Sequence, residues 1–175
     1  PVAVTVHDVT LPVTSYLKTS INFRKENLRD ARYYGSNWND ELDSRLPSLA
    51  LKYRFTPRVD LPLGEALQMG SDGRLRTDWD GFDGRVEHWL EQGITCFELK
   101  LDVPWKLNPR ELDEAWGARF EAIDAHLEEK GWADLFYFYF WDEPSPFELG
   151  DLRSRLQVIT RRAPHIRNVL TYGIT

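Results

Sequence analysis

The chain has 175 residues, of which 42% are hydrophobic and 29% charged, a balance typical of a globular protein with a sizeable core. The net charge is −6 and no dense run of Lys and Arg occurs, so the sequence lacks the basic patch of a nucleic-acid-binding protein. No stretch approaches the roughly 20 apolar residues that a bilayer span requires. We therefore expect neither a nucleic-acid partner nor membrane insertion.

The sequence also argues against a disulfide scaffold and a cofactor. Its single cysteine, Cys96, lies in an apolar run and reads as a small core residue. The four histidines have no metal-ligand spacing, and no Gly-rich phosphate loop, dinucleotide fingerprint or Gly-x-Ser-x-Gly motif occurs. We expect no metal and no cofactor.

The first elements are predicted strands. Val2, Val4 and Val6 alternate with other residues at the period of a half-buried strand, which we interpret as the end of a preceding β domain and linker over residues 1–14. Residues 15–23 read as a second strand, which leads into a polar, aromatic loop over residues 24–38. Loops of this length are usually functional or mobile.

A helix, a weak strand and a turn are predicted next. Apolar residues from Leu42 to Tyr53 recur at helical spacing after Asn39 and Asp40, either of which can cap the first turn. Pro47 is expected to kink this helix or to delay its start. A short strand is predicted over residues 58–61, and the run Ser71-Asp-Gly-Arg predicts a turn.

From residue 82 onward helices and strands alternate. A helix over 82–92 ends at Gly93, and a strand over 95–103 has one apolar and one charged face. Asn108 and Pro109 begin a helix that runs to Gly131 with one apolar stripe. Residues 135–141 are apolar or aromatic throughout, as in a strand buried on both faces. A helix over 146–162 and a strand over 166–171 follow.

This order predicts an α/β fold with parallel strands. Five strands and four helices fit the N-terminal half of a (β/α)8 TIM-type barrel, because a whole barrel takes about 250 residues. We therefore expect residues 15–175 to form the first part of a (β/α)8 catalytic barrel. A small open α/β sheet is the alternative.

The strongest chemical signal is the pair Asp142 and Glu143 at the end of the aromatic strand, because reactive groups of parallel α/β folds lie at that edge. Two carboxylates beside aromatic walls suit hydrolysis of a glycosidic bond. One acid protonates the departing oxygen, and the other stabilises the positive charge that develops at the sugar carbon. Pro144 is expected to force Glu143 into an extended conformation that projects it into the loop. We expect Glu143, the longer side chain, to be the proton donor.

Taken together, the order of these motifs resembles glycoside hydrolase family 123 and its uncharacterised relatives. The residues that carry the resemblance are Leu11-Pro12, Thr19-Ser20, Asp72–Trp79 before Phe82-Asp83, Gly93, Trp141-Asp-Glu-Pro144, and Ala163–Arg167 through Leu170-Thr171. The resemblance implies a β-sandwich before a (β/α)8 barrel, and a retaining, substrate-assisted β-N-acetylhexosaminidase, with N-acetylgalactosamine favoured. By that likeness Asp142 orients the 2-acetamido group of the substrate, and Glu143 is the acid and base.

The resemblance also implies a glycan or glycoconjugate substrate, a secreted or periplasmic location, and a missing barrel half or another chain that covers the exposed sheet edges. Candidate substrate-binding residues carry alternatives. Lys100 and Asp102 either line the barrel mouth or pair with Glu98, and Trp141 either stacks on a sugar or packs in the core. The remaining candidates are Tyr34 and Trp38 in the first loop, and Arg58.

Two other functions remain open from the sequence. One is a non-catalytic carbohydrate-binding barrel. The other is a structural module in which the acid pair only caps a helix.

Overall fold

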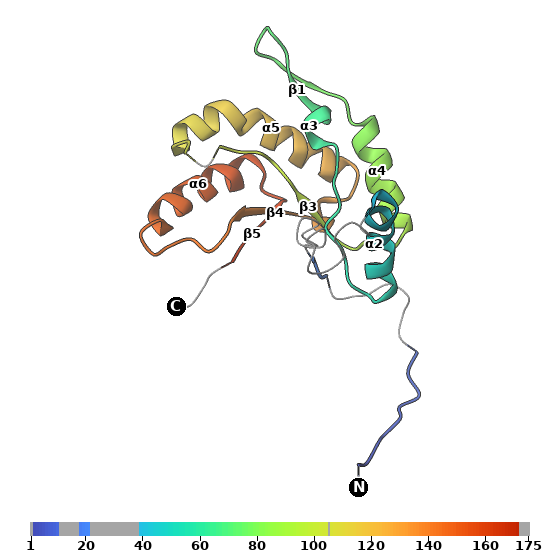
Figure 1. The fold of residues 1–175 in the computed structure, drawn as a ribbon. Helices are drawn as coiled ribbons and strands as arrows, with labels where there is room; N and C mark the ends of the chain where they lie inside the picture. The colour runs from blue at the N-terminus through green and yellow to red at the C-terminus, as the bar shows by residue number, and fades with distance from the viewer. Residues whose placement is uncertain (1, 11–17, 22–38, 105, 172–175) are drawn as a thin grey trace.

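The computed structural model describes residues 2–10, 18–21, 39–104 and 106–171, and Figure 1 shows their arrangement. The helices are α2 (Asp40–Lys52), α3 (Leu63–Ala66), α4 (Asp80–Glu91), α5 (Pro109–Glu129) and α6 (Leu149–Arg162), with a short 3₁₀ helix η2 (Ala133–Leu135). The strands are β1 (Leu67–Met69), β2 (Leu75–Thr77), β3 (Phe97–Leu99), β4 (Phe136–Trp141) and β5 (Arg167–Leu170).

The central sheet is parallel, with the order β3-β4-β5. Phe97 of β3 pairs with Phe136 of β4, and Tyr137 of β4 pairs with Arg167 of β5. Parallel neighbours need a crossover, and α5 and α6 provide the two that join these strands (Figure 1). The chain is therefore a mixed α/β protein, as predicted. In the described residues its sheets are small and form no closed barrel.

Helix α5 is stabilised both by a cap at its N-terminus and by an apolar stripe that it buries. The Asn108 side chain accepts from the backbone N–H groups of Arg110 and Glu111 at 3.0 Å, and the Glu111 side chain accepts from the Asn108 N–H, which completes a capping box. Its apolar stripe lies in the core against β4. The buried members of that stripe are Leu112, Phe120, Ile123 and Leu127.

The predicted strand over residues 15–23 is described only at residues 18–21, where Ile21 forms a single bridge. Ile21 pairs with Pro57 in parallel, through the bonds Ile21 N–H to Thr56 O and Arg58 N–H to Ile21 O, both 2.9 Å. No strand over 58–61 forms, because Pro57 cannot donate to a ladder and Pro62 follows closely. The Thr56 hydroxyl lies 3.2 Å from that of Thr95, so this segment borders the start of β3.

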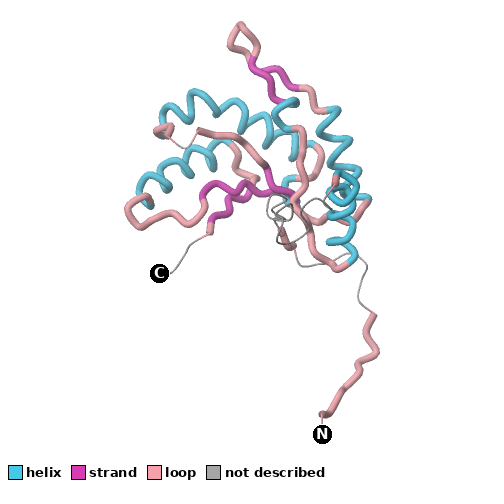
Figure 2. The backbone as a smooth tube through the Cα atoms, in the orientation of Figure 1, coloured by secondary structure: helices cyan, strands magenta, loops and turns pink. Residues whose placement is uncertain are grey.

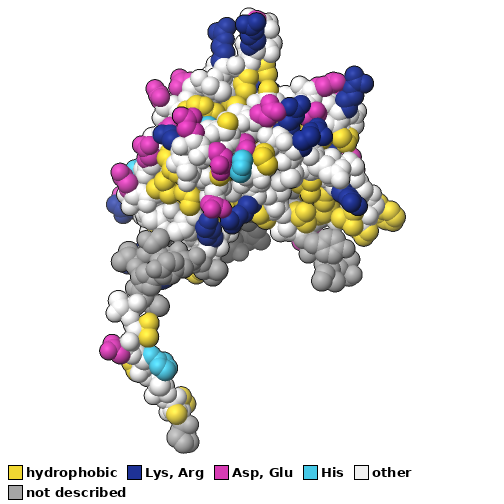
Figure 3. All heavy atoms as spheres, turned by 180° about the vertical axis from the view of Figure 1, so that it is seen from behind, with side chains coloured by type: hydrophobic (Ala, Val, Ile, Leu, Met, Phe, Trp, Pro, Cys, Tyr) yellow, Lys and Arg dark blue, Asp and Glu magenta, His cyan; other side chains and the backbone are white. Residues whose placement is uncertain are grey.

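The prediction of a strand over Val2, Val4 and Val6 is wrong for the described residues. Residues 2–10 form no strand, and the three side chains are 79–91% exposed. Figure 3 shows this segment projecting from the body of the molecule. An alternating pattern forms a strand only where a partner strand satisfies its backbone and covers its apolar side, and no such partner lies among the described residues.

Several helix and strand boundaries differ from the prediction. Helix α2 begins at Asp40 with Asn39 as its cap, so Pro47 lies inside the helix and does not delay its start. Helix α6 begins at Leu149, three residues later than expected, and β3 keeps only residues 97–99. The predicted turn after Ser71 is present. It connects β1 and β2, which form an antiparallel hairpin that was not predicted from the sequence (Figure 2). Gly93 has φ +92°, the left-handed conformation predicted for it.

Burial of β4 on both faces is also wrong. Phe136 and Phe138 are buried under the helices, whereas Tyr137 and Tyr139 on the opposite face are only partly buried. The described helices α5 and α6 pack on one face of the sheet, so alternate residues of the aromatic strand point away from the core. That second face forms the candidate site.

Candidate functional site

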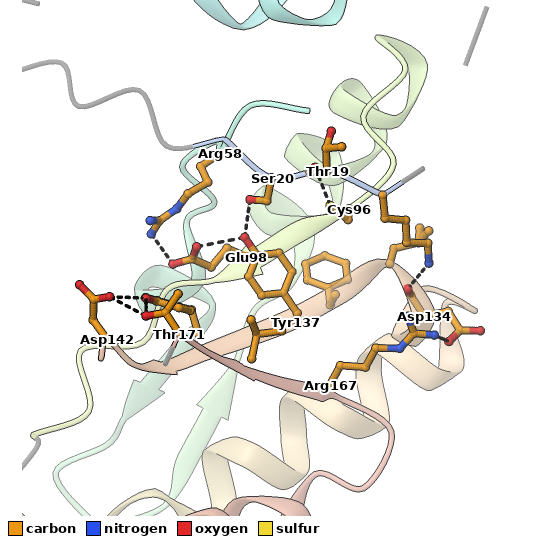
Figure 4. A pocket seen from close by; sticks show the side chains of 15 residues that line it. Thr19, Ser20, Arg58, Cys96, Glu98, Asp134, Tyr137, Asp142, Arg167 and Thr171 are labelled. Carbon is orange, nitrogen blue, oxygen red and sulfur yellow. Dashed lines mark hydrogen bonds and ion pairs between the residues drawn. The ribbon is translucent and has the colours of Figure 1, made fainter. Parts of the chain in front are cut away.

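The sheet face opposite the helical core borders a cavity of about 610 Å³ (Figure 4). This volume lies within the range of small-molecule sites. Side chains from β4 and β5 form one wall, and β3 with the segment around Arg58 forms another. The cavity contains the two carboxylates Glu98 and Asp142, so one member of the predicted acid pair lies in the same cavity as a carboxylate of β3.

Asp142 is held at the end of β4 by two hydroxyl groups. Its Oδ1 accepts from the Tyr139 hydroxyl at 2.7 Å and from the Thr171 hydroxyl at 2.8 Å. These two hydroxyl oxygens lie 2.9 Å apart. Burial raises the pKa of Tyr139, and its bond to Asp142 adds to the shift, so the phenol keeps the proton that it donates. Residues of β4 and of the segment after β5 thus fix the orientation of this carboxylate.

Glu143 adopts a different backbone from the one predicted. Its φ is +47°, in the left-handed region, which is uncommon for a residue with a side chain. The prediction of an extended conformation is therefore wrong, although Pro144 does keep Glu143 out of a right-handed helix. Its N–H donates to the Thr171 hydroxyl at 3.1 Å. Glu143 is exposed and is not among the described residues that line the cavity beside Asp142.

Glu98 of β3 supplies the second carboxylate of the cavity. Its Oε1 pairs with the Arg58 guanidinium, and its Oε2 accepts from the Tyr137 hydroxyl at 3.1 Å (Figure 4). The Glu98 side chain is 9% exposed. Burial raises the pKa of this carboxyl, and the charge of Arg58 offsets only part of the rise. A polar residue on the inner face of a strand was the available sequence signal, but the sequence reasoning took Glu98 only as an ion-pair partner.

The other predicted binding residues separate into groups. Arg58 lines the cavity, whereas Lys100 and Asp102 are exposed and are not among the described residues that line it. Tyr34 and Trp38 lie outside the described residues. The alternative predicted for Lys100 and Asp102, an ion pair with Glu98, does not occur among the ion pairs of the described residues, where Glu98 pairs with Arg58.

Trp141 lies beside a second, smaller cavity of about 310 Å³. The Arg155 guanidinium, 1% exposed, lies 5.4 Å from the Trp141 ring and 5.1 Å from the Phe140 ring. Cation–π contacts of this kind fix the aromatic end of β4 against α6. Tyr139 and Asp142 border this cavity as well as the larger one, so the two cavities meet at the end of the strand.

The described residues contain no candidate metal site and no candidate membrane span. No group of three or more His, Cys, Asp or Glu side chains there is placed to hold a metal ion. None of the described helices is both long enough and apolar enough to cross a bilayer. In comparisons with known proteins, no family model matches the chain, and no curated protein matches it.

Proposed function

We propose that this chain is part of a glycoside hydrolase that cleaves β-linked N-acetylhexosaminides, with N-acetylgalactosamine favoured. The observation that carries the proposal is the placement of Asp142. It lies where a parallel strand ends, its orientation is fixed by two hydroxyls, and it borders a cavity with tyrosines in its wall. Parallel α/β folds carry their reactive groups at this edge.

The proposed mechanism is retaining and substrate-assisted, as the resemblance to glycoside hydrolase family 123 implies. Asp142 orients the N–H of the 2-acetamido group, whose oxygen attacks the anomeric carbon. Glu143 donates its proton to the departing oxygen, and then removes a proton from the water that opens the intermediate. A nucleophile already attached to the substrate needs no third carboxylate, and its proximity lowers the entropic part of the barrier.

The proposed architecture is the N-terminal half of a (β/α)8 barrel. The parallel bridge of Ile21 with Pro57 and the parallel order β3-β4-β5 support it, since both follow the chain order that a barrel requires. In that numbering β4 is the fourth barrel strand. The proposal includes a second half, supplied by further sequence or by another chain, that covers the sheet edges.

The test is hydrolysis of the 4-nitrophenyl β-glycoside of N-acetylgalactosamine. The expected result is turnover that falls about 10²- to 10⁴-fold in Glu143→Gln, the usual contribution of a general acid. Asp142→Asn should lower kcat by a similar factor, because the neutral amide has no negative charge with which to polarise the acetamido N–H. Exposed Glu114, which pairs with Arg110 on α5, provides the matched control Glu114→Gln. No turnover by the chain with the second barrel half present, or turnover untouched by both site substitutions, would refute the proposal.

The same substitutions separate the two other functions. A non-catalytic carbohydrate-binding barrel binds the glycoside without turnover, which calorimetry detects. The helix-capping role has no support at α6, because this helix begins at Leu149 with Glu148 as its N-cap, six residues beyond the acid pair. A chain whose two acid variants change only the melting temperature would be a structural module.

A further inference from the structure

Glu98 and Arg58 form an ion pair in the wall of the cavity that Asp142 also lines, and the proposed mechanism gives this pair no role. Figure 4 shows both side chains pointing to the same space as Asp142. Arg58 is contributed by the segment after the bridge at Pro57, and Glu98 by β3. Two separate segments therefore bring opposite charges together at a surface that a ligand can reach.

This pair is more enclosed than an ordinary surface ion pair. The side chain of Glu98 is 9% exposed and that of Arg58 28%, whereas the members of the α5 pair Arg110–Glu114 are 86% and 63% exposed. Charges removed from water lose solvation that their mutual attraction often fails to restore. An enclosed pair is therefore weak support for a purely stabilising role, and its position in a cavity wall calls for another one.

Both members keep hydrogen-bonding capacity beyond the contacts in the described residues. A carboxylate accepts at about four lone-pair positions, and the bonds from Arg58 and Tyr137 occupy two of those of Glu98. A guanidinium has five N–H donors, and one of those of Arg58 bonds Glu98. An acceptor and a donor thus stand side by side at one wall. A sugar hydroxyl needs both, because it donates one bond and accepts others.

The net charge of the pair favours an uncharged ligand. An Arg alone selects carboxylates and phosphates, but here its charge is balanced by Glu98. Tyr137 supports the arrangement from β4. Burial raises the pKa of Tyr137 to about 12, so its phenol stays protonated and donates to Glu98. Ser20 contacts the same phenol oxygen from the other side.

We propose that Glu98 and Arg58 together bind two neighbouring hydroxyls of a neutral sugar ring, and that this pair sets which sugar the cavity accepts. Tyr137 is a positioning residue that holds the Glu98 carboxylate. The choice of a sugar as ligand rests on the proposed function. The recognition itself does not require hydrolysis, so the two are tested by different measurements.

The experiment measures binding by calorimetry on the whole chain. The probes are methyl β-N-acetylgalactosaminide and a panel in which one ring hydroxyl at a time is replaced by hydrogen. Loss of a hydroxyl that binds a charged group should weaken binding to the wild-type chain by about 10- to 150-fold. In Glu98→Gln and Arg58→Met the parent glycoside should bind at least about tenfold more weakly, and the variants should no longer distinguish it from that deoxy form.

Two further variants protect the test from loss of folding. Tyr137→Phe keeps both charges, so it should fold and bind the parent glycoside about three- to tenfold more weakly through a looser Glu98. Glu114→Gln removes an exposed carboxylate of the same type and should bind as the wild type does. If Glu98→Gln unfolds, the binding of the parent glycoside to Tyr137→Phe tests the inference, and binding as tight as that of the wild type would refute it.

The outcomes separate this inference from the proposed function. Binding that depends on Glu98, without any turnover when the second barrel half is present, supports the inference and refutes the hydrolase. Turnover and binding that are unchanged in both Glu98→Gln and Arg58→Met refute the inference and leave the hydrolase standing. Wild-type chain that binds no member of the panel overturns the inference as well.

Discussion

Asp142 accepts hydrogen bonds from two hydroxyl groups, so the proposed site can be tested by removing single oxygen atoms. Tyr139→Phe and Thr171→Val each delete one donor to Oδ1, at 2.7 and 2.8 Å, and keep almost the whole side-chain volume. A hydrogen bond to a charged group contributes about 1.5–3 kcal/mol, and each 1.4 kcal/mol is about a tenfold change. If Asp142 must be oriented in the transition state, kcat/KM should fall about 12- to 150-fold in either variant.

The double variant gives a sharper expectation. Both donors bond the same oxygen and lie 2.9 Å from one another, so they belong to one network. Once one donor is lost the carboxylate is already held less firmly, so the second loss should cost less. The combined loss should therefore be smaller than the product of the single losses, by about 0.5–3 kcal/mol of coupling.

The assay is initial-rate hydrolysis of the chromogenic N-acetylgalactosaminide, with thermal melting of each variant alongside. Tyr53→Phe, on a tyrosine that is 65% exposed at the end of α2, is the matched control for deletion of a phenol oxygen. Two folded single variants with kcat/KM within about twofold of the control would refute the role given to these hydroxyls, because a bond of about 1.5 kcal/mol should then have been visible.

Three further predictions concern the scaffold. Asn108→Ala, which removes the acceptor of the α5 capping box, should lower the free energy of unfolding by about 1 kcal/mol in urea titrations. Leu127→Ala deletes a fully buried side chain and should cost about 2–5 kcal/mol, whereas Leu149→Ala, at 39% exposure, should cost less than about 1 kcal/mol; equal losses would contradict the assigned core. The hydrogen bond to Asp124 raises the pKa of His165, so its stabilising contribution is complete below the unfolded pKa of about 6.5 and is lost as pH rises through the higher folded value. The stability difference between wild type and His165→Ala should therefore shrink from acidic to basic pH, and a difference that grows would contradict the ion pair.

Local signals predicted the helices better than the strands. Asn108 and Pro109 define where α5 begins, and its apolar spacing defines the face it buries, so all the required information lies within one segment. The alternation of Val2, Val4 and Val6 is as regular, yet no strand forms there. Strand formation depends on a partner elsewhere in the chain, which periodicity does not contain.

The sequence predicted only the part of the candidate site that neighbouring residues along the chain define. Asp142 follows directly from an aromatic run that ends at an acid, and the structure places it beside the cavity. The contact of Glu98 with Arg58 joins residues forty positions apart, and nothing in either neighbourhood indicates the other. The aromatic run led to the wrong prediction of a strand buried on both faces, because the residue type alone does not show which face of a strand the helices cover. Tyr137 and Tyr139 face the cavity for that reason.

Thr171 links the two predicted acids in a way that bears on their role. Its hydroxyl accepts from the N–H of Glu143 and donates to Asp142, so one side chain after β5 fixes the backbone of one acid and the carboxylate of the other. The left-handed conformation of Glu143 costs about 1–3 kcal/mol in a residue other than glycine, and such conformations cluster at functional sites. Neither acid caps the helix that follows. The proposed function requires both carboxylates to reach one substrate, which a regular strand does not allow, because its alternation turns neighbouring side chains to opposite faces.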